Sequence, residues 1–456
     1  MKIILSLLSI LLLSQTISLG SKAPNVLFLL ANDQAFQTIS AHGNRGVTTP
    51  NLDRLVASGT TFSNAYNMGS WQNDVSQASR TMMFSGRFLW HASKRGTEGE
   101  KHPILTTVFR DAGYDTYGTG KWHLTENGAM QKAFTRVINP RPGNLLLAKQ
   151  DRSKFTPWNK DYGGFWKGES HVTTITGNSA ISLLKTATSA EKPFFLYVGF
   201  NAPHTTWQYE AKERSKIKAE RLSIPPNVKG NHFYIKNAWP KVIDDSFVSR
   251  RYLDYYAMVS LLDYQVGRIL DALEKSGKKD ETLIVFLSDN GLNSGENGII
   301  GRRHLYETTL RAPLIIAGPG VPKNKFNDRL VYLQDVIPTL LNLSGIPKPT
   351  FCQFRSFLPN SKGWAEPPWE DLLGAYRYEI RSIRVNDSKL VLYRREGERH
   401  ARLYDLLNDP FEMNDILHKS SSRELVDDCL SRLQRWETFS GGSLLVRKYF
   451  AQPGIK

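Results

Sequence analysis

Three apolar segments of the sequence each end in polar side chains that could bind a ligand. Residues 24–31 precede Asn32 and Asp33, residues 194–200 precede a segment ending in His204, and residues 283–287 precede the segment 288–291 with Asp289 and Asn290. Short apolar segments bounded by polar residues are typical of buried parallel strands. Ligands bind at the carboxyl ends of such strands in open α/β sheets, so we expect these side chains at one sheet edge. Taken singly, each has a simpler interpretation as a helix cap, a turn or a loop residue.

The segments between these strands carry helical periodicity. Residues 252–276 place apolar side chains along one face, from Met258 to Leu273. Strands alternating with helices predict an α/β fold with a mostly parallel central sheet flanked by helices. From about residue 345 prolines become frequent, residues 382–385 and 389–393 are typical of antiparallel strands, and residues 424–437 of a helix. We therefore expect a larger domain over 21–345 and a smaller α+β domain over 346–456.

Residues 76–87 begin with Ser-Gln-Ala-Ser-Arg, from Ser76 to Arg80. On its own, this serine could simply cap a helix. The segment resembles the signature of the formylglycine-dependent sulfatases, type I members of the alkaline phosphatase superfamily, whose pattern begins with Cys or Ser. The likeness continues in family order along most of the chain, with Thr-Pro-Asn-Leu-Asp-Arg-Leu at 49–55, Gly-Lys-Trp-His at 120–123, Ala-Pro-His at 202–204, Asp-Asn-Gly at 289–291, Leu-Tyr-Glu at 305–307, and Leu-Tyr-Asp-Leu with Asp-Pro-Phe-Glu at 403–412.

The resemblance implies the chemistry of sulfate ester hydrolysis. Ser76 would be oxidised after synthesis to formylglycine (3-oxoalanine), whose hydrate supplies the nucleophile beside one divalent cation, usually Ca²⁺. Calcium prefers oxygen ligands, and the implied metal ligands are Asn32, Asp33, Ser76, Asp289 and Asn290. The implied catalytic residues are Ser76, Arg80, Lys121, His123, His204 and Arg302. In these roles the arginine at 80 supports the hydrate, the cations at 121 and 302 bind sulfate oxygens, and the two histidines stabilise the hydrate and protonate the leaving oxygen.

Three positions depart from the family pattern. Asn32 replaces the first of two aspartates, so calcium should bind more weakly because one negative charge is lost. Asn297 stands where the family has a histidine, and Arg302 replaces a lysine while keeping the charge, with Arg303 as an alternative donor. A serine at position 76 implies a maturase of the radical type, which accepts serine as well as cysteine.

The amino-terminal residues and the net charge indicate where the protein is located and what kind of partner it binds. Residues 1–20 combine Lys2, an apolar run over 3–13 and small residues before position 21, which is the pattern of a secretory signal peptide. That run is too short to span a membrane and no later stretch is long enough, so we expect a secreted or periplasmic protein. The net charge of +16 over 456 residues favours an anionic partner. Export argues against nucleic acid as that partner and for a sulfated carbohydrate.

The only cysteines, Cys352 and Cys429, could pair or remain free.

Three functions remain open from the sequence. The first is an exported sulfatase that hydrolyses sulfate monoesters on a carbohydrate. The second is a degenerate homologue that binds sulfated glycans without turnover, and the third is a phosphoryl-transfer relative that uses unmodified Ser76. The elements at 76–80 and 120–123 favour the sulfatase branch. The segments 71–75, 131–166 and 205–239 should determine which sugar is bound, and tryptophans within them could stack on sugars or pack in the core, namely Trp158, Trp166, Trp207 and Trp239.

Overall fold

The computed structural model describes residues 23–94, 104–124, 129–141, 155–159, 163–166, 171–209, 211–217, 219–228, 245–358, 369–395 and 398–442. The predicted signal peptide at 1–20 lies outside the described residues. Among the described residues, no helix combines the length and the apolarity that crossing a membrane requires.

The central element is an eight-stranded sheet in the order β15-β2-β14-β11-β1-β9-β5-β6. Its strands are β1 (Asn25–Ala31), β2 (Gly59–Phe62), β5 (Asp115–Lys121), β6 (Arg136–Arg141), β9 (Phe194–Gly199), β11 (Thr282–Ser288), β14 (Leu314–Ala317) and β15 (Lys325–Asn327). Strands β11, β1, β9, β5 and β6 are parallel, whereas β14 is antiparallel to both of its neighbours. The predicted α/β fold with a mostly parallel sheet is therefore confirmed.

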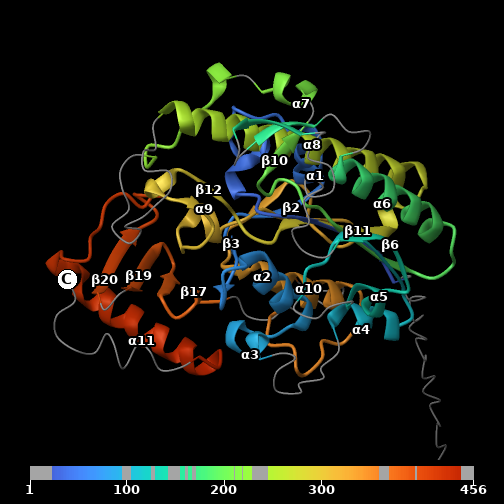
Figure 1. The fold of residues 1–456 in the computed structure, drawn as a ribbon. Coiled ribbons are helices and arrows are strands. Elements are labelled where there is room, and N and C mark those ends of the chain that lie inside the picture. The colour runs from blue at the N-terminus through green and yellow to red at the C-terminus, as the bar shows by residue number, and fades with distance from the viewer. Residues whose placement is uncertain are drawn as a thin grey trace, which may run out of the picture.

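Alternate residues of β1 pack into two different cores. Val26, Phe28 and Leu30 belong to one buried cluster, and Leu27 and Leu29 belong to the other. A strand buried on both faces needs apolar residues at every position, which explains the unbroken apolar run seen in the sequence. The two layers of helices are visible in Figure 1, with α1, α6 and α8 over one face and α2, α4 and α10 over the other.

The helices have the following bounds: α1 (Pro50–Ser58), α2 (Val75–Ser85), α3 (Leu89–Ser93), α4 (Leu105–Asp111), α5 (Ala129–Ala133), α6 (Val172–Thr188), α7 (Ala211–Ser215), α8 (Asp245–Lys275), α9 (Glu307–Leu310), α10 (Val336–Leu343) and α11 (Arg423–Phe439). Three small sheets contain β7 (Phe155–Asn159), β8 (Gly163–Trp166) and β10 (Trp207–Tyr209); β12 (Asn293–Ser294) and β13 (Ile300–Gly301); and β3 (Ala65–Tyr66) and β16 (Val331–Tyr332).

A second, five-stranded sheet has the order β20-β19-β18-β17-β4. It contains β17 (Asp371–Tyr376), β18 (Ile380–Val385), β19 (Ser388–Arg395) and β20 (Glu398–Asp405), with each consecutive pair of these four antiparallel and with α11 packed beside them. The two predicted strands and the terminal helix lie here, each slightly longer than expected. β4 (Gly69–Ser70) adds a parallel edge from the earlier part of the chain, so the sheet joins both regions; the boundary at 345 stays a prediction. Cys352 and Cys429 are both buried and are not joined in a disulfide.

Candidate active site

The ends of β1 and β11 bring four polar side chains together. Ala31 lies opposite Ser288 in the parallel pairing, so the residues that follow both strands emerge side by side. The backbone N–H of Asp33 donates to Asp289 Oδ1 at 3.0 Å, and the Asn290 amide donates to Asp33 Oδ1 at 2.8 Å. Asn32, Asp33, Asp289 and Asn290 are all fully buried. The sheet edge predicted from the sequence therefore exists and is closed off from bulk solvent.

Ser76 reaches this cluster from α2. Asp74 begins the helix by accepting a hydrogen bond from Gln77 N at 3.3 Å, and Gly86 ends it with a left-handed φ of 69°. Ser76 lies in the first helical turn, where free N–H groups favour an anionic centre. Its hydroxyl donates to Asn32 Oδ1 at 3.0 Å and to Asp33 Oδ1 at 3.2 Å. The hydroxyl that the sequence singled out thus lies against two of the predicted metal ligands.

Arg80 links the helix to two strands. It lies one turn after Ser76 on α2 and is fully buried. Its Nε donates to Asp289 Oδ2 at 2.7 Å, while one terminal nitrogen donates to the Lys121 carbonyl and to the Tyr197 hydroxyl, both at 2.8 Å. Arg80 therefore holds Asp289 in place and fixes the end of β5.

β5 delivers Lys121 and His123 to the same place. Lys121 is fully buried at the end of the strand, and burial together with the charge of Arg80 lowers the pKa of its ammonium group to about 7. His123, two residues later, has a left-handed φ of 57°, a conformation that non-glycine residues rarely adopt. Asp33 has the same feature after β1, with a φ of 63°. Both side chains are thus presented by sharp turns directly after parallel strands.

Asp74, which the sequence analysis did not identify, contacts His123. The Nε2 atom of His123 lies 3.2 Å from Asp74 Oδ2. Burial alone would raise the pKa of Asp74, but the hydrogen bond and the charge of His123 hold it well below its usual range. Burial lowers the pKa of His123, and the contact with Asp74 opposes that effect. In the sequence, the only indication of a role for Asp74 was its position two residues before Ser76.

Arg302 and His204 face Asp33 from another side. Arg302 follows β13; it lies 2.9 Å from Asp33 Oδ2 and contacts His204 Nε2 at 2.9 Å. A guanidinium group only donates, so Nε2 of His204 must accept and Nδ1–H donates to the Thr205 carbonyl. Burial, then the charge of Arg302, hold the pKa of His204 well below its usual value. In this arrangement His204 is neutral, and its Nδ1 proton is held by the backbone.

The donor set fits a hard divalent cation. Calcium takes oxygen ligands at about 2.3–2.6 Å, so neighbouring ligands lie roughly 3 Å apart. Ser76 Oγ lies at such a distance from both Asn32 Oδ1 and Asp33 Oδ1. Burial raises the pKa of Asp33 to about 6, with Asp289 adding to the rise and Arg302 opposing it, so a cation between the two carboxylates would relieve their repulsion. Within the described ranges, no group of three or more His, Cys, Asp or Glu side chains is placed to hold a metal. A cation held between Asp33 and Asp289 would therefore need amide oxygens to complete its ligands.

Several other predicted positions lie away from this centre. Asn297 donates to the carbonyl of Glu412 at 3.3 Å and accepts from Asn227 at 3.1 Å, so it connects the β12–β13 region to the carboxyl-terminal segment. Arg303 donates to the Asn73 carbonyl at 3.3 Å. Trp207 is fully buried and donates to the Pro203 carbonyl, which makes it a packing residue. Side chains at 158, 166 and 239 lie outside the described residues.

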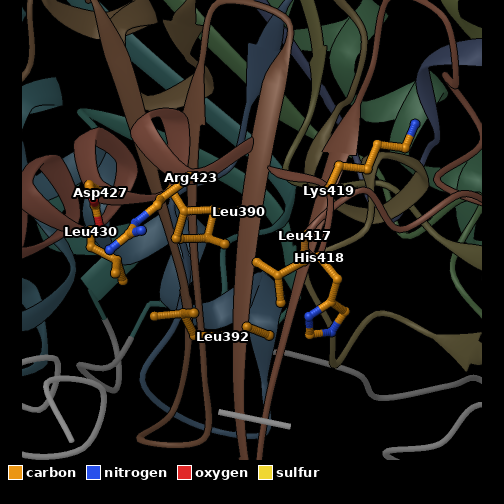
Figure 2. A pocket seen from close by; sticks show the side chains of 10 residues that line it. Leu390, Leu392, Leu417, His418, Lys419, Arg423, Asp427 and Leu430 are labelled. Carbon is orange, nitrogen blue, oxygen red and sulfur yellow. The ribbon is translucent and has the colours of Figure 1, made fainter. Parts of the chain in front are cut away.

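A cavity of about 260 Å³ lies elsewhere, between β19, β20 and α11. Figure 2 shows its lining, with the leucine side chains at 390, 392, 417 and 430 beside the charged groups of Lys419, Arg423 and Asp427. None of the predicted catalytic or metal-binding residues lines it. The cavity is therefore separate from the cluster around Ser76.

Comparison with known proteins assigns the chain to a family. Residues 24–346 match the sulfatase family model, and residues 295–438 match the model described as N-sulphoglucosamine sulphohydrolase, C-terminal. The first match covers most of the chain and contains every predicted site residue. The chain belongs to the sulfatase family, and it is a sulfuric ester hydrolase.

Individual relatives agree with this assignment. An N-acetylglucosamine-6-O-sulfatase from Bacteroides thetaiotaomicron is 25% identical over an alignment covering 88% of this chain and 84% of the relative. The structure of BT4656 in complex with its substrate D-glucosamine-2-N,6-O-disulfate superposes with a TM-score of 0.73 at 21% identity, covering 94% and 99% of the two chains. A phosphonate monoester hydrolase of Agrobacterium radiobacter has the same TM-score of 0.73 at 18% identity, covering 91% and 96%. These structural likenesses establish the fold, which sulfatases share with that phosphonate hydrolase.

Proposed function

We propose that this protein is an exported sulfatase that removes sulfate from a sulfated amino sugar, with Ser76 oxidised to formylglycine and one Ca²⁺ ion in the site. The observation that carries the proposal is the position of the Ser76 hydroxyl, at the first turn of α2 and within 3.2 Å of oxygens from Asn32 and Asp33. A glucosamine-type substrate is supported by the relatives, one named for N-acetylglucosamine 6-sulfate and another bound to a glucosamine disulfate. The net charge of +16 favours such an anionic sugar.

The residues that would hold the cation are Asn32, Asp33, Asp289, Asn290 and the modified side chain at 76. When bound, calcium would lower the pKa of a coordinated hydroxyl and offset the negative charge of the sulfate group. Arg80 keeps Asp289 in place through its 2.7 Å contact. Lys121, which is buried, and Arg302, which is partly exposed, supply positive charge for the sulfate oxygens. Because His204 donates to its own backbone region, His123 is the histidine better placed to exchange a proton.

Sulfate release with a matched pair of serine variants tests the proposal. The protein would be produced with a radical-type maturase and assayed on glucosamine 6-sulfate and glucosamine N-sulfate. Ser76→Ala should reduce sulfate release about a thousandfold or more, because the nucleophile is lost. Ser85→Ala makes the same change at the other end of α2 and should retain activity. Equal sulfate release by Ser76→Ala and the wild type would refute the proposal.

The same preparations test the alternative of phosphoryl transfer, which the fold shared with a phosphonate hydrolase supports. If Ser76 acts unmodified, protein made without a maturase should cleave phosphate or phosphonate monoesters faster than sulfate esters. A protein that binds sulfated glucosamine but releases neither sulfate nor phosphate, even with a maturase present, would instead be a degenerate homologue.

A further inference from the structure

The carboxylate of Asp74 contacts two different parts of the active site. Oδ1 accepts a hydrogen bond from Gln77 N at 3.3 Å and so caps α2, the helix that carries Ser76. Oδ2 lies 3.2 Å from Nε2 of His123, which follows β5. One side chain therefore connects the start of the nucleophile's helix to the histidine turn, two segments that lie far apart in the sequence.

The contact determines which nitrogen of His123 carries the proton. An ionised carboxylate only accepts hydrogen bonds, so the ring nitrogen facing Asp74 must be Nε2–H. In neutral His123 the lone pair is then on Nδ1. Nδ1 is buried and has no hydrogen-bond partner among the residues that the structure describes. It is the nitrogen left to take up a proton and to give it back.

We propose that Asp74 is a positioning residue that holds His123 in the Nε2–H tautomer, with Nδ1 free for proton transfer. The proposal rests on the sulfatase function above and extends it to a residue outside the family motifs found in this chain. The left-handed backbone at His123, with a φ of 57°, limits where its ring can lie. Asp74 then fixes the ring's rotation, because among the described residues only the Nε2 edge of the imidazole has a hydrogen-bond partner. A proton received at Nδ1 gives an imidazolium that Asp74 stabilises, and returning it restores the neutral ring.

Two substitutions separate this role from helix capping. Asp74→Asn keeps the cap, since asparagine caps helices as well as aspartate does. With its oxygen turned to Gln77 N, however, the amide presents N–H to His123, and Nε2 must then accept. The ring would switch to the Nδ1–H tautomer. Asp74→Ser also keeps a capping oxygen but leaves His123 without a partner.

The test measures the tautomer and the kinetics separately. Ring ¹⁵N NMR of histidine-labelled protein, with the His123 signals assigned by their loss in His123→Gln, reports the tautomer and does not require matured Ser76. Wild type should show Nε2–H and Asp74→Asn should show Nδ1–H. In matured enzyme, Asp74→Asn should lower kcat about a hundredfold or more with KM changed less than about threefold. Asp74→Ser should lower kcat while its melting temperature stays near that of the wild type.

Asp271→Asn is the matched control, because it removes one carboxylate from an exposed pair with Arg54. It should leave the NMR signals and kcat unchanged. An unchanged His123 tautomer in Asp74→Asn, or an unchanged kcat in that variant, would overturn the proposal. Failure of the sulfatase function has a different signature: sulfate release would be absent in the wild type and in every variant, whereas the tautomer measurement would still give its result.

Discussion

At the scale of single residues, a basic side chain faces each of the two carboxylates near the predicted cation. Asp33 and Asp289 are the carboxylates, and Arg80 and Arg302 each pair with one of them at 2.7 and 2.9 Å. Lys121 adds a third basic group. Calcium affinity rises with the number of charged oxygen ligands, so the amide at Asn32 leaves the site with less attraction for calcium than a three-carboxylate site would have.

Replacing Asn32 with aspartate should therefore tighten calcium binding. Asn32→Asp converts the amide whose oxygen lies 3.0 Å from Ser76 Oγ into a carboxylate without changing the size of the side chain. We expect the Kd for Ca²⁺, measured by titration calorimetry on calcium-free protein, to fall about tenfold, which is about 1.4 kcal/mol. Asn414→Asp makes the same change at an exposed position and should leave the Kd unchanged. Equal or weaker binding by Asn32→Asp would show that position 32 is not a ligand.

Much of the site was predictable residue by residue, for a definite reason. Polar residues directly after apolar strands must emerge at one sheet edge, so the positions of Asn32, Asp33 and Asp289 followed from local pattern alone. Asp74 was not predictable in this way, because its contact with His123 depends on how α2 meets β5. The neutral state of His204 likewise follows from the position of Arg302, a residue distant in sequence.

At the scale of elements, the site depends on close packing between β5 and β9. Gly199 ends β9, and a Cβ there would overlap the Lys121 carbonyl and the Tyr197 hydroxyl. These two oxygens are the acceptors that hold Arg80. A glycine inside a strand marks such a close approach of neighbouring groups. The missing side chain therefore lets the strand ends come near enough to anchor the arginine.

Gly199→Ala should consequently destabilise the fold by about 3 kcal/mol, since neither the Lys121 carbonyl nor the buried Tyr197 ring can easily move. Urea denaturation monitored by tryptophan fluorescence would measure this. Gly113→Ala is the control: nothing lies near a Cβ at Gly113, so only its left-handed φ of 93° opposes alanine, at about 1–2 kcal/mol. A loss at Gly199 no greater than that at Gly113 would contradict the close-packing explanation.

The elements themselves were predicted unevenly. The strands β1, β9 and β11 and the helix α11 were expected within a few residues, because each is long enough to show a pattern. The helix α8 was also expected, but it begins at 245, seven residues before the predicted start at 252. The short strands β2, β14 and β15, which complete one side of the sheet, were not identified. A four-residue strand has too few positions to show a periodicity, and its place in a sheet is decided by its neighbours.

At the scale of the whole molecule, a buried ionic cluster joins the second sheet to the catalytic region. Lys389 on β19 pairs with Glu307 at 3.0 Å and with Glu412, and Arg384 on β18 pairs with Glu307 at 3.2 Å. Tyr66 donates to Glu307 at 2.5 Å. Burial raises the pKa of Glu412 to about 7, Lys389 opposes that rise, and Glu307 adds to it. Two carboxylates in one buried site require the lysine for compensation.

Removing the lysine should loosen this junction. Lys389→Met leaves Glu307 and Glu412 without their shared cation, and we expect the free energy of unfolding to fall by about 3–5 kcal/mol. Glu307 keeps its pair with Arg384, so Glu412 is the carboxylate left without a cation. Adding Glu412→Gln in the same chain removes that charge and should restore part of the loss. Denaturant unfolding of the single and double variants measures both effects. A double variant less stable than Lys389→Met would show that repulsion between the carboxylates is not the cause.

The state of Ser76 is the central claim, and mass spectrometry of its tryptic peptide in protein from the native source tests it most directly. Residues 55–80 form one such peptide, since Arg54 and Arg80 bound it and no Lys or Arg lies between. Oxidation to formylglycine removes two hydrogens, so the peptide should be about two daltons lighter than encoded, with fragment ions placing the loss at position 76. A peptide of the encoded mass, from protein that still releases sulfate, would contradict the account.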